Sequence, residues 1–402
     1  MLDKERESYL RTMRSFCSPL CFLPSLVMCQ EWTALPDLPG SARDDAAAFV
    51  IGADIYVGTG MDVGFNLTAD WYRFNTIDQS WSPVAAIPGG ARQYALAVAA
   101  NGHGYVIGGT TGAGATDDVW RYDANDNSWS LRAPLLSAVL AAAGGSYQER
   151  FHVVGGIGSD GAVVTLHQVY DHATDTWTLA TPPPMSVHRA AAFVLADGVH
   201  VIGGATEDFV DTDQHLLYDA NGGGWSTLAA LPEGRYASDA SAVHGGAVVA
   251  GGVDAGPPVA VRGEVWGYDP WSAVWSAIPP LPSGPRRGAV LVEVDGRLYF
   301  GTGSDATQRY KDWWMLEVPV NMMEPTSDPQ APFPIPTTGP LHVAKAVTPT
   351  DHTLRLLNSS GQEVRRWTAT EQVLDLSGRA PGVYILQIEG ENVRRHRLVK
   401  TP

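Results

Sequence analysis

The feature that most constrains the fold is a tryptophan that recurs about every 48 residues over most of the chain. The spacings between successive members are 49, 48, 48, 48 and 50 residues, for Trp32, Trp81, Trp129, Trp177, Trp225 and Trp275. Each unit has the same internal order: a run of small apolar residues, a glycine pair, an aromatic residue followed by Asp, and the tryptophan. A period this regular indicates repeated supersecondary units that bury a core only by stacking on one another.

Short β-rich runs separated by Gly, Asp and Pro are typical of strands and turns. The second unit is expected to form strands at about residues 92–99, 104–108, 119–123 and 128–132. A four-stranded sheet repeated radially is a propeller blade, so the chain is predicted to be all-β with six blades. The sixth unit ends at residue 318 without a closing tryptophan, and a strand at residues 31–35 is expected to complete it and leave no open sheet edge.

The glycine pair, a downstream Tyr-Asp and the tryptophan together resemble the Kelch repeat family. The Tyr-Asp pairs begin at Tyr122, Tyr170, Tyr218 and Tyr268. The resemblance covers residues 31–318 and implies a six-bladed Kelch β-propeller. Two units depart from it, with Gly-Thr-Gly at 58–60 and 301–303, where the same sharp backbone bend is expected.

The first 30 residues lie outside the repeat and have a charged segment followed by an apolar one, as a secretory signal peptide does. Met13 is an alternative start. All three cysteines lie in this segment, so a mature chain cut near Cys29 holds no disulfide. A lipoprotein signal with Cys29 lipidated is the alternative, and the apolar run is too short and proline-broken for a membrane span.

Residues 319–340 are expected to be a proline-rich linker, and residues 341–402 a small C-terminal β-sandwich domain. The segments 333–341, 374–378, 381–384 and 395–400 resemble the C-terminal sorting domain of type IX secretion cargo, although Ile335 departs from that pattern. The resemblance implies contact with the type IX secretion machinery, export to the outer surface of a Gram-negative bacterium, and removal of this domain. A generic small β-domain that binds a partner is the alternative.

The acidic charge is concentrated in the repeats. Residues 31–340 hold 14 Lys and Arg against 34 Asp and Glu, within a whole-chain net charge of −16. So acidic a body argues against nucleic acid and anionic lipid as partners. It suits a soluble extracellular protein, which we expect to be a monomer.

Arginines are few in this body, and five of them fall 10 to 12 residues after a unit's tryptophan. They are Arg43, Arg92, Arg189, Arg235 and Arg286, and the third unit has Ala138 there. At the head of the innermost strands they are expected to surround one mouth of the central channel, where guanidinium groups would bind carboxylates. The alternative is that they tie neighbouring loops together. Tyr94 and Tyr236 are candidate faces for stacking a sugar.

Other candidates are weaker. His188 at the channel mouth, Glu207 and Asp239 are candidate proton carriers. His152 and His200 occupy a position that holds tyrosine in other units, and we interpret them as packing residues. The acidic stretch 207–213 lacks a recognisable Ca²⁺ spacing. No motif for a metal or cofactor was found, and none is predicted.

Two function classes remain. The first is a secreted or cell-surface binding module that holds a glycan or a protein ligand in the central funnel. The second is an enzyme resembling the six-bladed Kelch sialate mutarotases, acting on an anionic sugar with the five arginines holding its carboxylate. A copper galactose oxidase is discarded, because its radical centre needs a cysteine and residues 31–402 contain none.

Overall fold

The computed structural model describes residues 31–220, 222–270, 272–318, 340–342, 353–358, 362–368, 373–375, 382–389 and 394–400. The predicted signal peptide and most of the predicted linker lie outside these residues. The described part is all-β and contains no helix. It therefore also holds no helix that could span a membrane.

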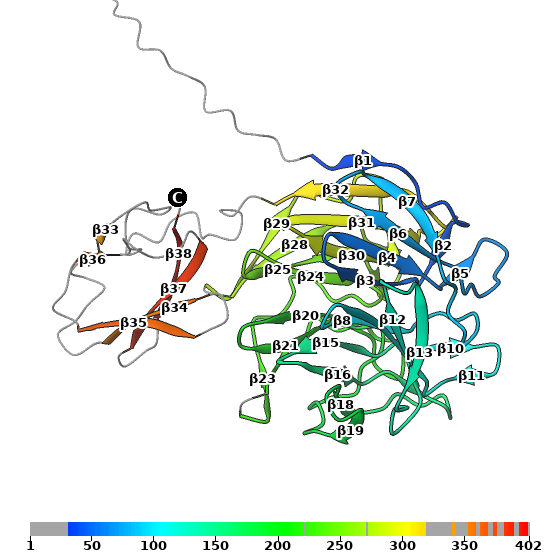
Figure 1. Cartoon of the computed structure of the whole chain (residues 1–402), viewed down its shortest axis with the longest axis horizontal. Coiled ribbons are helices and arrows are strands. Elements are labelled where there is room, and N and C mark those ends of the chain that lie inside the picture. The colour runs from blue at the N-terminus through cyan, green and yellow to red at the C-terminus, as the bar shows by residue number, and fades with distance from the viewer. Residues whose placement is uncertain are drawn as a thin grey trace, which may run out of the picture. The chain divides into compact units, whose positions relative to one another are not determined.

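Residues 31–318 form six antiparallel four-stranded sheets, the blades of a propeller (Figure 1). Blades one to three are β3 (Ala47–Ile51), β4 (Asp54–Gly58), β6 (Trp71–Asn75) and β7 (Ser80–Val84); β8 (Leu96–Ala100), β9 (His103–Ile107), β12 (Val119–Asp123) and β13 (Ser128–Arg132); and β15 (Ala143–Tyr147), β16 (Arg150–Val154), β18 (His167–Asp171) and β19 (Thr176–Leu179). Blades four to six are β20 (Ala191–Leu195), β21 (Gly198–Ile202), β22 (His215–Asp219) and β23 (Gly224–Thr227); β24 (Asp239–Val243), β25 (Gly246–Ala250), β28 (Val265–Asp269) and β29 (Val274–Ile278); and β30 (Arg287–Val294), β31 (Arg297–Ser304), β32 (Trp313–Glu317) and β1 (Thr33–Leu35).

The sixth blade takes its fourth strand from the other end of the propeller. Strand β1 pairs antiparallel with β32, with Thr33 opposite Met315 and Leu35 opposite Trp313. The Trp32 ring also packs edge-on against Phe300, at 5.8 Å between ring centroids. This pairing closes the circle of blades and satisfies the outer edge of β32.

The recurring tryptophan holds each blade to the one before it. Its indole Nε1 donates a hydrogen bond to a backbone carbonyl 44 to 46 residues earlier, from Trp81 to Pro36, Trp129 to Ala85, Trp177 to Ala133, Trp225 to Thr181, and Trp275 to Ala229. The same rings pack with the tyrosine of the Tyr-Asp pair, as Trp129 does with Tyr122 at 4.9 Å. The period therefore fixes the contacts between blades as well as the strands within them.

The second residue of each glycine pair lies where a side chain would meet the segment that leads into the innermost strand of its own blade. A Cβ on Gly109, whose φ is +94°, would come within 2.8 Å of the Gln93 carbonyl oxygen. In the two Gly-Thr-Gly segments, Thr59 and Thr302 adopt a positive φ of 58°. Gly-Thr-Gly thus makes the same bend as Gly-Gly, and its threonine accepts the left-handed conformation.

The innermost strand of blade two begins later than the sequence predicts. In blade two the first strand begins at Leu96, whereas residues 92–99 were expected to be extended. Tyr94 has a left-handed φ of 56°, which breaks the strand and turns the chain toward the channel. Short strand pairs continue the loops around this end: β2 (Arg43–Asp44) with β5 (Met61–Asp62), β10 (Thr110–Thr111) with β11 (Gly114–Ala115), β14 (Val139–Leu140) with β17 (Ile157–Gly158), and β26 (Val253–Asp254) with β27 (Ala260–Val261).

The C-terminal residues form two sheets of their own. One is four-stranded, in the order β35 (Glu363–Thr368), β34 (Thr353–Asn358), β37 (Gly382–Glu389) and β38 (Arg394–Lys400). The other pairs β33 (Pro340–His342) with β36 (Val373–Asp375). On the four-stranded sheet, the apolar side chains of Leu354, Leu356, Trp367 and Leu386 are buried.

Candidate functional site

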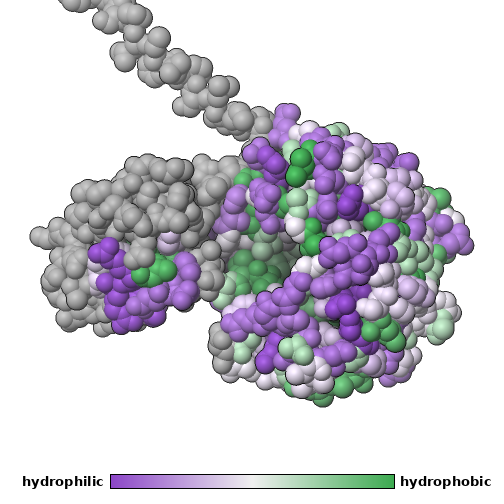
Figure 2. Space-filling model, in the orientation of Figure 1, coloured by the Kyte–Doolittle hydropathy of each residue, from purple (hydrophilic) through white to green (hydrophobic). Residues whose placement is uncertain are grey.

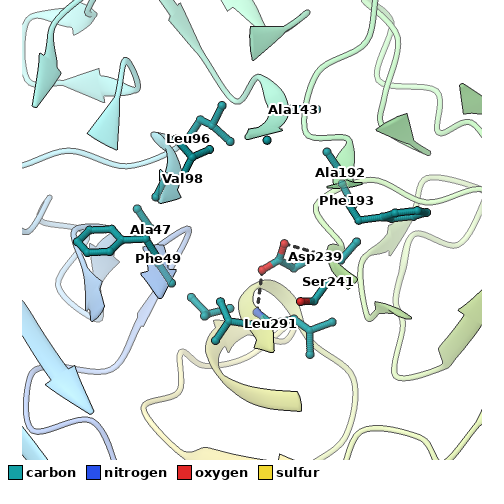
Figure 3. Close-up of a pocket in the computed structure, with 18 of the residues that line it drawn as sticks. Ala47, Phe49, Leu96, Val98, Ala143, Ala192, Phe193, Asp239, Ser241 and Leu291 are labelled. Atoms are coloured by element: carbon teal, nitrogen blue, oxygen red, sulfur yellow. Dashed lines mark hydrogen bonds between the residues drawn. The ribbon is translucent and has the colours of Figure 1, made fainter. Parts of the chain in front are cut away.

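A central channel runs between the innermost strands of the six blades and encloses a cavity of about 440 Å³. Its walls are mostly alanine and glycine, because six strand edges converge there and leave little room for side chains. Looking down the channel, Phe49 and Phe193 point away from the open centre, whereas the Asp239 carboxylate points toward it (Figure 3). The face of the propeller shown in Figure 2 is mostly polar, with a hollow in which apolar residues gather.

One mouth of the channel, where the innermost strands begin, is built from six equivalent residues that we call the mouth ring. All six have left-handed φ values between 52° and 56°: Asp45, Tyr94, Ala141, Arg189, Ala237 and Gly288. Backbone hydrogen bonds link five of the six neighbouring pairs, each from the N–H of one residue to the carbonyl of its counterpart in the preceding blade. These five bonds, Asp45 to Gly288, Gly288 to Ala237, Ala237 to Arg189, Arg189 to Ala141 and Ala141 to Tyr94, measure 2.8 to 2.9 Å.

Three members of the mouth ring carry functional side chains, and they lie around a cavity of about 140 Å³. The Arg189 guanidinium stacks over the Tyr94 ring, with its carbon 4.7 Å from the ring centroid, and over Phe209 at 5.4 Å. Asp45 lines the same cavity. Ala141, Ala237 and Gly288 leave the rest of the mouth open, since their side chains are small.

Burial in the mouth raises the pKa of the Asp45 carboxyl to about 7, and the nearby Asp44 carboxylate adds to this effect. The positive charges of Arg189 and Arg287 act in the opposite direction. The Tyr94 hydroxyl has its pKa raised to about 12, mainly by burial and then by Asp45. The mouth therefore holds a carboxyl group that changes charge near neutral pH beside a permanent cation.

The four arginines Arg43, Arg92, Arg235 and Arg286 lie behind the mouth ring and are completely buried. In each, Nη1 donates to a carbonyl 16 residues later, at Thr59, Gly108, Gly251 and Thr302 respectively. Three also form two-pronged pairs with a carboxylate: Arg43 with Asp70, Arg92 with Asp118, and Arg286 with Asp312. These contacts join the loops within a blade and use the donors that a ligand would need.

Arg235 differs from the other three in its acidic neighbours. Its Nη2 lies 4.0 Å from Glu233 Oε2, and burial lowers the pKa of its guanidinium. A second arginine, Arg262, takes up the local carboxylates, binding Asp254 and lying 3.7 Å from Glu233.

Arg189 does not belong to this buried series. The second glycine of each pair donates its N–H to the residue in the arginine position of the next blade, and in blades three and four that residue is Val139 and Val187. Counting from the tryptophan aligned Arg189 with Arg92, but Arg189 lies two residues after the equivalent position, Val187. In the third unit the count gave Ala138, which lies one residue before the equivalent position, Val139. The loops before the innermost strands differ in length, so counting from the tryptophan misplaces the register.

The other sequence candidates are spread over the mouth and the channel. His188 is buried: its Nε2 donates to the Thr206 carbonyl at 3.2 Å, and its Nδ1 accepts from Arg189 at 3.2 Å. Burial, with Arg189 nearby, lowers the pKa of His188 to about 4. Glu207 is exposed on the loop that also carries Phe209.

Asp239 lies in the channel wall rather than in the mouth ring. Its oxygens accept backbone N–H groups of Ala240 and, from the next blade, Leu291 at 2.7 Å. Burial raises the pKa of the Asp239 carboxyl to about 6. Tyr236 is half-buried, and its backbone pairs with Val253 beside the mouth ring.

Sequence reasoning named two members of the mouth cluster, Arg189 and Tyr94, and missed Asp45 and Phe209. Asp45 follows Arg43 by two residues, but the carboxylate that binds Arg43 is Asp70. The signal that finds Asp45 is the repeat itself: it has the same position relative to Arg43 as Tyr94 has to Arg92. Among the described residues no group of three His, Cys, Asp or Glu is arranged to hold a metal ion.

Comparison with known proteins matches two segments to families. The Kelch motif model matches residues 91–136, and the secretion system C-terminal sorting domain model matches residues 332–400. The chain carries Kelch repeats and a secretion sorting tail. A tail of this family implies that a secretion system exports the protein.

Relatives that match part of this chain carry different names. Kelch-like protein 35 of Mus musculus is 35% identical over 132 residues, which are 33% of this chain and 22% of the relative. The N-acetylneuraminate epimerase of Pasteurella multocida (strain Pm70) is 34% identical over 134 residues, 30% of this chain and 33% of the relative. The chain thus spans a third or less of the length of these relatives.

A solved structure resembles a larger part of this chain. The structure of YjhT superposes with a TM-score of 0.61 at 19% identity, over 69% of this chain and 95% of that one. At this identity the likeness concerns the propeller fold alone.

Proposed function

We propose that this protein is a secreted binding module whose Kelch propeller holds a carboxylate-bearing ligand, a glycan or an acidic protein segment, at the mouth ring. The observation that carries the proposal is Arg189. Its guanidinium lies over Tyr94 at the edge of a cavity and is half-buried, unlike the fully buried arginines behind it. An arginine held flat by an aromatic ring keeps its fork of donors directed at a planar anion.

The residues of the mouth have separate roles in this proposal. Arg189 pairs with the ligand carboxylate, while Tyr94 and Tyr236 supply aromatic edges to the remainder of the ligand. Arg43, Arg92, Arg235 and Arg286 act as positioning residues that hold the mouth loops, since each is completely buried and donates from Nη1 to a backbone carbonyl. The strongly acidic body around the half-buried Arg189 disfavours polyanions and leaves room for a ligand with a single negative group.

The remaining domain assignments belong to the same proposal. Residues 1–30 act as the signal peptide, 319–340 as the linker, and 341–402 as the sorting domain that the type IX machinery recognises. The propeller then acts as a monomer outside the cell or on its outer surface, without a cofactor.

The test is calorimetry with the full chain at pH 7.5, using N-acetylneuraminic acid and an acidic peptide as anionic probes and N-acetylmannosamine as the neutral probe. We expect one anionic probe to bind and the neutral one not to. Arg189→Ala should weaken binding at least tenfold, since a charge-assisted pair to a partly buried arginine contributes about 1.5–3 kcal/mol. Arg150→Ala, an arginine distant from the mouth, is the matched control and should bind as the wild type does. Equal affinity for neutral and anionic probes would contradict the proposal.

A second candidate is a mutarotase-like enzyme acting on an anionic sugar. Asp45 favours it, because a carboxyl with a pKa of about 7 beside a carboxylate-binding arginine is suited to moving a proton at a sugar. Relatives named N-acetylneuraminate epimerase also support it. In this reading His188, Glu207 and Asp239 remain weaker proton carriers.

The enzyme candidate is tested by NMR of freshly dissolved α-N-acetylneuraminic acid. Catalysis predicts anomer exchange faster than in buffer, and Asp45→Asn should return it to the buffer rate. Exchange at the buffer rate with saturating wild-type protein leaves binding as the function.

A further inference from the structure

A second cavity, of about 320 Å³, lies between blades three and four, beyond the mouth ring along the innermost strand of blade three. We call it the lateral cavity. Blade three contributes residues from the end of β15 through β19, and blade four contributes two: Tyr147, Gln148, Arg150, His152, Val169, Thr178, Ala180, Tyr218 and Ala220. Unlike the channel, it is lined by large polar and aromatic side chains.

The lateral cavity lies where the repeat departs from its pattern. In blades one and two the second strand carries a tyrosine opposite an arginine of the third strand, Tyr56 with Arg73 and Tyr105 with Arg121. In blade three the same two positions hold His152 and Val169. Both replacements are shorter, so the space that a tyrosine and an arginine occupy elsewhere is open here.

Blade four also has a histidine at this position but does not leave it free. His200 Nε2 bonds to Asp197 Oδ1 at 3.0 Å, three residues earlier. The equivalent acid in blade three is Glu149, which lies 3.4 Å from His172 instead. His152 Nε2 consequently has no hydrogen-bond partner among the described residues, although His152 is only 3% exposed.

The hydrogen-bond network fixes which proton His152 carries. The Thr181 carbonyl can only accept, so His167 donates to it from Nδ1 at 3.1 Å and keeps a lone pair on Nε2. His152 Nδ1 therefore donates to His167 Nε2, at 2.9 Å. Burial lowers the pKa of both histidines to about 4, which keeps them neutral. His152 Nε2 is thus a bare acceptor in a cavity wall.

Arg150 provides the second polar group. It precedes His152 by two residues on β16, so both side chains lie on one face of the strand about 7 Å apart. Its guanidinium is largely exposed and lies 3.8 Å from Asp171, too far for a hydrogen bond. Tyr218 closes the cavity from blade four, with its ring centroid 5.6 Å from that of His152.

We propose that the lateral cavity binds a small planar carboxylate with a hydroxyl group at its opposite end. The carboxylate pairs with the Arg150 guanidinium, the hydroxyl donates to His152 Nε2, and the ring between them packs against Tyr147 and Tyr218. A six-membered aromatic ring substituted at its para positions is the probe we choose, since it holds the carboxylate and the hydroxyl at opposite ends. This site is separate from the mouth ring and does not depend on the function proposed for it.

The experiment is calorimetric titration of the full chain at pH 7 with 4-hydroxybenzoate, compared with 3-hydroxybenzoate, benzoate and phenol. We expect one saturable site for 4-hydroxybenzoate and at least tenfold weaker binding of the other three. Arg150→Gln should weaken binding about tenfold, and His152→Tyr, which restores the residue of blade one and fills the cavity, should abolish it.

Arg189→Ala is the matched control and should leave this binding unchanged, which separates the lateral cavity from the mouth ring. A thermal melt of each variant establishes that it is folded, and Arg150→Gln decides the matter if His152→Tyr does not fold. The proposal is overturned if 4-hydroxybenzoate shows no saturable binding, if benzoate binds as tightly, or if Arg150→Gln binds like the wild type.

Discussion

Equivalent buried positions hold different types of residue in two parts of the propeller. Blades one and two differ in this respect from blades three and four. Blades one and two bury an arginine against an aspartate behind the mouth, Arg43 with Asp70 and Arg92 with Asp118. Blades three and four have Val139 and Val187 in the arginine position. Between the strands, blades three and four each bury a histidine pair instead: His152 with His167, and His200 with His215.

The difference shows that the repeat tolerates either ionic or apolar packing behind the mouth, as expected when a buried ion pair and a hydrophobic pair are of similar net stability. The positions that depart from the repeat pattern are also the ones that leave polar side chains able to bind a ligand. Blade four, freed from the buried arginine, places Arg189 on the mouth ring two residues later, and blade three opens the lateral cavity. Residues that follow the repeat are thus structural, and those that depart from it line both candidate sites.

The largest expected effect is acid sensitivity in blades three and four. Burial lowers the pKa of His152 and His167 to about 4 and of His215 to about 3, from 6.5 in the unfolded chain. The unfolded chain therefore binds more protons between about pH 4 and 6.5, so stability is full above pH 6.5 and falls as the pH is lowered through this window. Each such histidine costs about 2 kcal/mol of unfolding free energy by pH 5. Urea unfolding at pH 7.5 and pH 5 measures the loss.

Blade two supplies the control for acid sensitivity. It has Tyr105 and Val119 where blade three has His152 and His167, so the double variant His152→Tyr with His167→Val removes one titrating pair. The loss of unfolding free energy between pH 7.5 and pH 5 should be smaller than in the wild type by the contribution of two histidines. An unchanged slope would assign the acid sensitivity to other groups.

The next effect concerns the ion pair of blade two. Asp118→Ala leaves the fully buried Arg92 guanidinium without its carboxylate and should lower the unfolding free energy by about 3 kcal/mol. Arg92→Val combined with Asp118→Leu copies the Val139 and Leu166 of blade three. This double variant should be more stable than Asp118→Ala alone. If it is less stable, the two kinds of blade are not interchangeable solutions.

The smallest effect is local to the mouth ring. Arg189→Gln removes a positive charge that lowers the pKa of Asp45, so this pKa should rise above about 7, by roughly one unit at the separation of groups sharing a mouth. A ¹³C NMR titration of labelled aspartate measures it. Arg150→Gln, in the lateral cavity, should leave the Asp45 titration unchanged.

Much of the fold was predictable because the residues that recur in each unit are of types that require a particular backbone conformation or a particular packing contact. The tryptophan period predicted the six blades. The sixth unit ends at residue 318 without a closing tryptophan, and this pointed to the N-terminal strand, Thr33–Leu35, that pairs with β32. The site was less predictable. Five arginines at similar spacing look alike in the sequence, yet four are buried behind the mouth and Arg189 stacks on Tyr94 in it.

The sequence by itself therefore determined the all-β propeller and its blade number, because the periodic Gly, Tyr-Asp and Trp residues act through local turns and through contacts between neighbouring units. It also determined the sorting tail, through short segments at the C-terminal end. Only the tertiary structure decided which charged side chains are free. Asp45 meets Arg189 and Tyr94 because closing six blades brings residues from three of them to one mouth, and His152 keeps an open acceptor because Glu149 turns to His172. Such contacts depend on distances between side chains of different blades, and these distances cannot be deduced from the spacing of residues in the sequence.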